Sequence, residues 1–165
     1  MKSLIGVYNQ HAEAIEAIKL LKGEAIREEN ISLMGKTSVD KRDSSEGTID
    51  TNDPSTEAPL VVGAIAGPVL GVLTGIGIFA IPGLGFIYGA GALVGALAGL
   101  DFGLIGGGVV SLLATLGIEN KHHLRFKEYL TKGKVILIAK GDEDDIEKAL
   151  KILHDYNQHY DLSVH

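Results

Sequence analysis

One charged residue, Asp101, lies inside an otherwise chargeless stretch that runs from Ala58 to Ile118. A carboxylate at the centre of a lipid bilayer costs about 2.5–3.5 kcal/mol on insertion scales, so such a residue usually has a function. One interpretation is therefore a proton or cation relay in a small channel-like oligomer. The other is that Asp101 caps a helix near the membrane interface. Because the stretch holds no Lys, Arg or His partner, the sequence favours the cap.

Six histidines raise the question of a metal site. His122 and His123 are adjacent, and His154, His159 and His165 follow near the end of the chain. Adjacent side chains on a helix point about 100° apart, which makes them poor joint ligands. We therefore predict that the histidines are surface residues and that the chain holds no metal.

Sequence motifs for other chemistry are incomplete. Gly83-Leu-Gly85 and Gly89-Ala-Gly91 resemble dinucleotide-binding fingerprints, but neither completes G-x-G-x-x-G or follows a strand in a βαβ unit. The chain has no cysteine, which excludes a thiol nucleophile and a cysteine-ligated metal. With 15 basic against 21 acidic residues, it also lacks the basic balance of nucleic-acid-binding proteins. We predict a protein that is not an enzyme, with no cofactor and no nucleic-acid partner.

Glycines in the chargeless stretch repeat every four residues. On a helix this spacing makes a groove without side chains, where a second helix backbone can approach closely. Lipid enforces helix formation, because an unpaired amide there costs several kcal/mol. The pattern predicts helix packing, and with it homo-oligomerisation and contact with membrane lipid, by two sets of residues: Gly63, Gly67, Gly71 and Gly75, then Gly91, Gly95, Gly99, Gly103 and Gly107.

The chargeless stretch is long enough to form a helical hairpin. Pro82, Gly83 and Gly85 oppose a continuous helix and predict its turn. The two predicted helices run from about Leu60 to Ala80 and from Phe86 to Ile118, and about 20 apolar residues suffice for one membrane crossing.

The predicted hairpin is compatible with two cellular locations. An even number of crossings keeps both polar halves on one side of a membrane, and Lys121, Arg125 and Lys127 favour the cytoplasmic side. The first expectation is therefore a membrane protein with a cytoplasmic α/β domain. The alternative is a cytoplasmic assembly in which the hairpins of many copies bury one another.

Polar sequences on either side of the stretch predict a small α/β domain. Before it, a strand, a helix and a strand are expected, and after it a helix, a strand, a helix and an edge strand. Together they predict an α+β fold: a ferredoxin-like sandwich interrupted by a Gly-rich hydrophobic helical hairpin. In chain order, the expected elements are the strand Leu4–Tyr8, the helix with Ala14, Ile15, Ile18, Leu21 and Ala25, the strand Ile31–Met34, the helix Asn120–Lys132, the strand Val135–Ala139, the helix capped by Asp142, and the strand Tyr160–Val164.

Four regions follow from this organisation. Residues 1–36 form the first half of the α/β domain and residues 37–58 a polar linker rich in Ser, Thr, Asp, Asn and Glu. Residues 59–118 form the Gly-rich hydrophobic insert, and residues 119–165 the second half of the domain.

Several short segments resemble the bacterial heat-induced general stress proteins (the general stress protein 17M-like domain). The resemblance extends over nearly the whole chain and implies a role in the general stress response, with no catalytic residues. It also implies that the membrane of the first expectation is the bacterial inner membrane. The segments that carry it are Ala12-Glu-Ala-Ile15, Ala17-Ile18, Ile81-Pro-Gly-Leu-Gly85, Gly89-Ala-Gly91, Leu116-Gly-Ile118 and Gly133-Lys-Val-Ile-Leu-Ile138.

Overall fold

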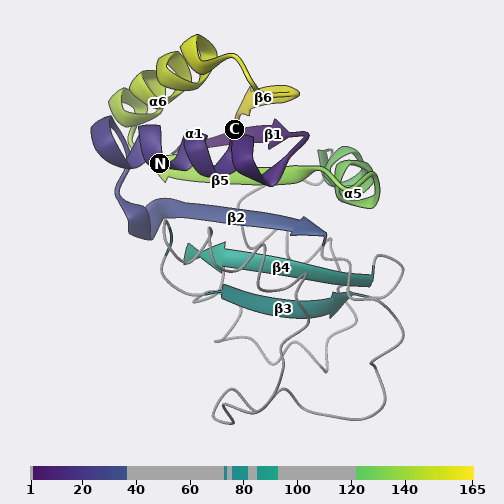
Figure 1. The fold of residues 1–165 in the computed structure, drawn as a ribbon. Helices are drawn as coiled ribbons and strands as arrows, with labels where there is room; N and C mark the ends of the chain where they lie inside the picture. Colours follow the sequence, from purple (N-terminus) through teal and green to yellow (C-terminus); the bar gives the residue numbers. More distant parts are fainter. Residues whose placement is uncertain (1, 37–72, 74–75, 82–84, 93–121) are drawn as a thin grey trace, which may run out of the picture.

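The computed structural model describes residues 2–36, 73, 76–81, 85–92 and 122–165. These residues form an α+β fold with one antiparallel sheet, in the strand order β3-β4-β2-β5-β1-β6 (Figure 1). The elements, in chain order, are β1 (Lys2–Tyr8), α1 (His11–Glu24), the short 3₁₀ helix η1 (Glu28–Asn30), β2 (Ile31–Lys36), β3 (Ile76–Ile81), β4 (Gly85–Gly91), α5 (His123–Thr131), β5 (Val135–Gly141), α6 (Glu143–Tyr156) and β6 (Asp161–Val164).

Two strand–helix–strand units interlock in the sheet. The unit β1-α1-β2 places its strands on either side of β5, and the unit β5-α6-β6 places its strands on either side of β1. Residues at opposite ends of the chain therefore pair directly, as in Ile5 with Ile138 and Ile5 with Ser163.

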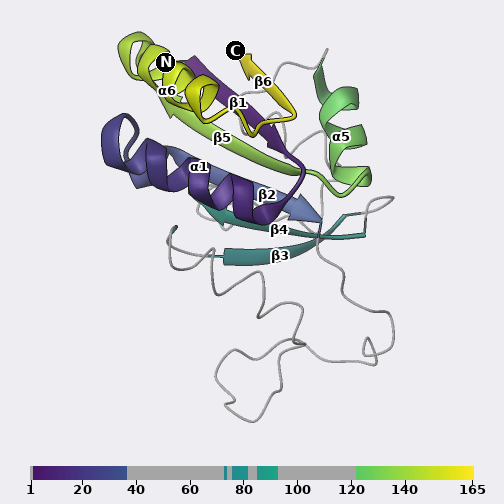
Figure 2. The same ribbon diagram turned by 45° about the horizontal axis from the view of Figure 1, so that its top comes forward.

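Helices α1 and α6 lie together over one face of the sheet (Figures 1 and 2). β1, β2 and β5 are apolar at most positions, and their residues are buried on both faces of the sheet. Buried side chains of α1, α6 and the strands form the core: Leu4, Ile18, Leu21, Leu33, Leu137, Ile146 and Leu153 are among its members. α5 stands at the end of the sheet where β1 ends and β5 begins (Figure 2).

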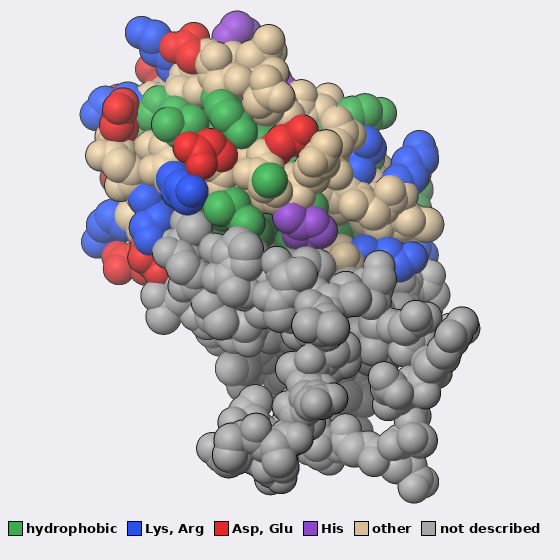
Figure 3. Space-filling view, viewed as in Figure 1, with side chains coloured by type: hydrophobic (Ala, Val, Ile, Leu, Met, Phe, Trp, Pro, Cys, Tyr) green, Lys and Arg blue, Asp and Glu red, His purple; other side chains and the backbone are tan. Residues whose placement is uncertain are grey.

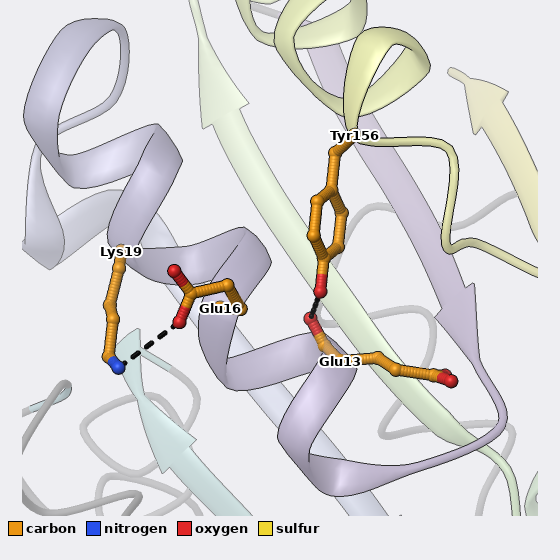
Figure 4. Close-up of polar contacts among 4 residues, drawn as sticks. All are labelled: Glu13, Glu16, Lys19 and Tyr156. Carbon is orange, nitrogen blue, oxygen red and sulfur yellow. Dashed lines mark hydrogen bonds and ion pairs between the residues drawn. The ribbon is translucent and has the colours of Figure 1, made fainter.

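Polar contacts fix the end of the helical layer where α1 begins and α6 ends. The Glu13 carboxylate accepts hydrogen bonds from the backbone N–H groups of Asn9 and Gln10 at 3.2 and 3.1 Å, which closes the first turn of α1. The Tyr156 hydroxyl at the end of α6 donates to the Glu13 carbonyl at 3.2 Å (Figure 4). Nearby, Lys19 and Glu16 form a surface ion pair of 3.2 Å within α1. The first of these contacts orients α1, and the second ties α6 to it.

The elements predicted for the two polar halves are confirmed, with shifted ends. Asp142 occupies the N-cap position of α6, as predicted, although its side chain makes no capping hydrogen bond. α6 ends at Tyr156, and the next residue, Asn157, caps it with a left-handed φ of 50°. α5 begins at His123, later than the predicted Asn120.

The helices predicted across residues 76–80 and 86–91 are wrong, because residues 76–81 form β3 and residues 85–91 form β4. Ile81 pairs with Gly85, so the chain reverses between strands where a turn between helices was expected. β4 also pairs with β2, which satisfies backbone groups that a helix would satisfy internally. Among the described helices, none combines the length and apolar character that a membrane crossing requires.

Candidate functional site

Most of the residues singled out by the sequence lie outside the described part of the chain. This holds for Asp101, for Pro82 and Gly83 of the predicted turn, and for Gly63, Gly67, Gly71, Gly75, Gly95, Gly99, Gly103 and Gly107. Gly85 and Gly91 are described, and they are the first and last residues of β4. The candidate site is therefore the place where the chargeless segment joins the sheet, which we call the hairpin junction: His11, Gly35, Leu73, Tyr88 and Gly91.

Gly91 does not belong to a helical groove, and this part of the glycine prediction is wrong. It faces Ser32 across the β2–β4 ladder and has a φ of +74°, a left-handed conformation that favours glycine. A Cβ atom there would lie 2.2 Å from the backbone oxygen of Ile31 and 3.4 Å from Cδ1 of the buried Leu73. Gly91 is thus required for the close approach of β4 to the start of β2.

Tyr88 lies farther along the same ladder. It pairs with Gly35, and its ring occupies the space that a side chain at Gly35 would fill, with Cε1 2.8 Å from the position of a Cβ atom. The ring of His11, in the first turn of α1, lies 5.3 Å from the Tyr88 ring, centroid to centroid. Strand β4, strand β2 and helix α1 therefore meet at one buried aromatic side chain.

A second tyrosine repeats the arrangement within β1. Tyr8 is fully buried, and its ring atoms lie 3.0 Å from the position of a Cβ atom at Gly6. Burial raises the pKa of both Tyr8 and Tyr88 far above the ordinary value of 10, and the Tyr156 and Glu13 charges add to the effect at Tyr8. Both phenols are neutral at every physiological pH, so neither is available as a phenolate nucleophile.

Three polar atoms at this end of the core have no hydrogen-bond partner within the described residues: the Tyr8 and Tyr88 hydroxyls and His11 Nε2. Burial lowers the pKa of His11, so its imidazole is held neutral near pH 7. The chemistry of this group is therefore that of neutral hydrogen-bonding side chains packed between apolar ones, and it suits a structural joint.

A second polar cluster joins α5 to β6. The Arg125 guanidinium contacts Asp161 at 3.0 Å, and the Tyr129 hydroxyl donates to the same Asp161 Oδ2 at 3.0 Å. The Tyr160 ring lies edge-on to Tyr129, with 5.6 Å between centroids, and Lys134 Nζ sits 3.6 Å from the centre of the Tyr160 ring. These contacts fasten the last strand to the helix that follows the chargeless segment.

The prediction that the histidines are surface residues is wrong for His123. His123 is buried, with 4% of its surface exposed, because it lies on the inner face of α5 with Phe126 and Leu130. The His122 and His165 rings lie 4.6 Å apart. No group of three potential metal ligands occurs among the described residues.

A shallow groove of about 260 Å³ runs between α1 and α6 and is lined by Glu24, Lys148, Lys151, Ile152 and Asp155. Two acids and two lysines balance each other there, and no aromatic side chain lines it. Acidic and basic side chains are likewise interspersed on the described surface that Figure 3 shows. Neither feature singles out a charged ligand.

Comparisons with known proteins gave no match to a family model, to a curated protein or to a solved structure. The resemblance to general stress proteins stays an expectation from the quoted segments. Sequence reasoning missed the roles of Gly35 and Tyr88. An isolated glycine within a strand is the available signal, since it often marks a close approach by another group.

Proposed function

We propose that this chain is a non-enzymatic bacterial stress-response protein that self-associates through its near-chargeless segment, residues 59–118. The observation that carries the proposal is the place of β3 at the end of the strand order. Within the described strands, β3 pairs only with β4. The segment thus enters the sheet and supplies one of the two edge strands among the described residues.

The composition of β3 favours association. Its sequence, Ile-Gly-Ile-Phe-Ala-Ile, contains no charge and no proline. Proteins usually protect an edge strand with lysine, proline, a bulge or a very short length, because unpaired backbone groups are a template for another chain. β3 has six residues and none of those sequence features, so pairing between copies is the arrangement that its chemistry favours.

The finer fold assignment belongs to the same proposal. The order β6-β1-β5-β2 with two interlocked strand–helix–strand units agrees with a ferredoxin-like sheet, to which β4 and β3 are added beside β2. In this interpretation the ferredoxin-like part is a rigid base, and the hairpin junction connects it to the associating segment. The stress-response role rests on the family resemblance alone.

A membrane-bound form is the second candidate. The observation in its favour is the absence of every charge except Asp101 between Ala58 and Ile118. In that form the segment contacts lipid at the bacterial inner membrane, and the sheet lies on the cytoplasmic side. Detergent-free fractionation separates the candidates: recovery as a large particle without lipid supports self-burial, and recovery only with membranes supports lipid contact.

To test association through β3, a lysine is introduced into this edge strand. Ile78→Lys and Phe79→Lys occupy neighbouring positions of the strand, so both alternating positions are sampled. We expect each variant to give particles of lower mass than the wild type in sedimentation velocity, because a lysine on an edge opposes pairing.

Leu20→Lys is the matched control, since it replaces an apolar residue with lysine on α1, where Leu20 is 37% exposed. It should leave the particle mass unchanged. Far-UV circular dichroism checks that each variant keeps its sheet. Folded β3 variants with the wild-type mass would refute association through this edge.

A further inference from the structure

The other edge of the sheet is β6. Among the described strands it pairs only with β1, and Figure 1 places it on the side of the sheet away from β3. Ser3 and His165 exchange both backbone hydrogen bonds, at 2.7 and 2.8 Å. In an antiparallel ladder such pairs alternate with pairs that do not bond. The amide and carbonyl groups of Leu162 and Val164 therefore point outward, away from β1.

Exposed apolar side chains gather beside this edge. Four large hydrophobic residues are exposed in the described part of the chain, and two of them, Tyr160 at 52% and Val164 at 42%, adjoin or belong to β6. A third, Leu124 at 79%, lies on α5, the helix that contacts β6 through Asp161. Apolar surface therefore borders the outward backbone groups.

The charge on the strand is neutralised within the chain. Asp161 is the only charged residue of β6, and both the Arg125 guanidinium and the Tyr129 hydroxyl bind it. β6 is short, with four residues, but it has no lysine and no proline. The strand itself therefore presents no unpaired charge and no blocked backbone amide to a second copy.

We propose that β6 pairs with β6 of a second copy of this chain, antiparallel and about a two-fold axis at Ser163. In this register Leu162 of one copy exchanges backbone hydrogen bonds with Val164 of the other, and the reverse bonds follow by symmetry. The two Ser163 residues face each other as a non-bonded pair. The outward groups of both copies are satisfied, since the positions that must donate and accept are the ones that point outward.

This interface goes beyond the proposed function, because it uses the edge opposite β3. It makes the two-fold dimer a unit that exists whether or not the chargeless segment associates. Assemblies that use both edges are then built from dimers, and their subunit numbers are even.

Cysteine cross-linking tests the register directly, since the chain contains no cysteine of its own. In non-bonded antiparallel pairs the Cα atoms lie about 4.5 Å apart, within the range that a disulfide spans. We expect Ser163→Cys to form covalent dimers under mild oxidation at least about tenfold faster than a surface control, because pairing raises the effective concentration of the two thiols. The control is Thr131→Cys, at an exposed position on α5.

Both cysteine variants are also prepared with Phe79→Lys, which separates this interface from the β3 edge. Rapid cross-linking of Ser163→Cys in that background supports the β6 dimer even if association through β3 fails. Cross-linking no faster than that of Thr131→Cys, in folded protein, overturns the proposal. As a second variant, Ser163→Glu places two like charges opposite each other, and an unchanged dimer mass would also overturn it.

Discussion

Two tyrosine rings, those of Tyr8 and Tyr88, each occupy the space over a glycine of the sheet. The glycines carry no side chain there because the rings already fill the position, and the packing leaves both hydroxyls buried. This arrangement gives strand β4 a fixed place beside β2. At the residue scale, the joint between the chargeless segment and the sheet therefore depends on small side chains more than on charged ones.

Replacing Gly35 with alanine should destabilise the fold. The new Cβ atom would lie 2.8–3.0 Å from the Tyr88 ring and hydroxyl, and a fully buried ring has little room to move. We expect a loss of about 1–3 kcal/mol in the free energy of unfolding, typical of overpacking. Gly23→Ala is the control: nothing lies within 4 Å of its Cβ position on α1, so it should stabilise the helix by up to about 1 kcal/mol. Equal urea midpoints for both variants would contradict this role of Gly35.

His11 predicts a pH dependence of stability. Burial lowers its pKa below the ordinary value of 6.5, so the unfolded chain binds more protons than the folded one between those two values. The free energy of unfolding therefore falls as the pH drops through 6.5 towards the pKa of the folded state. His11→Phe keeps a ring against Tyr88 and removes the titration. Urea unfolding between pH 7.5 and 5.5 should show a smaller decline for this variant, and an identical decline would exclude His11 as a source.

At the scale of elements, the outer halves were predictable and the hairpin was not. The run of β5 is short, β-branched and preceded by a glycine, which favours a buried strand, and the apolar stripe of α6 has helical spacing. A four-residue spacing of glycines is ambiguous. It places residues on one face of a helix, and because four is an even number it also places them on one face of a strand. In β4, Gly85, Gly89 and Gly91 alternate with larger residues, a strand pattern that the four-residue interpretation concealed. The pairing partner β2, distant in sequence, decides the outcome.

Gly91 and Gly133 offer a matched test of how β4 joins β2. Both have left-handed φ angles, +74° and +76°, but a Cβ atom at Gly91 would clash with the Ile31 carbonyl, whereas nothing lies within 4 Å of that position at Gly133. Alanine at Gly133 should cost about 1–2 kcal/mol for the backbone conformation alone. Alanine at Gly91 should cost at least about 1 kcal/mol more. Thermal and urea unfolding measure both, and equal losses would place β4 farther from β2 than we describe.

In the whole molecule, one sheet contains strands from both ends of the chain and from the chargeless segment. Its two edge strands differ in chemistry. β3 is an apolar strand of the chargeless segment, and β6 is a short strand whose one acid is neutralised by α5. The sequence predicted self-association from the four-residue spacing of the glycines in the chargeless stretch. Which backbone edges are open depends on strand order, and no local pattern in the sequence specifies that order.

The most direct test of self-association is the mass of the wild-type chain in detergent-free buffer, measured by native mass spectrometry or sedimentation equilibrium. Our account predicts a particle of several subunits, each of 17.4 kDa, and an even number of them if both edges are used. A stable, folded monomer of 17.4 kDa at micromolar concentration would contradict it.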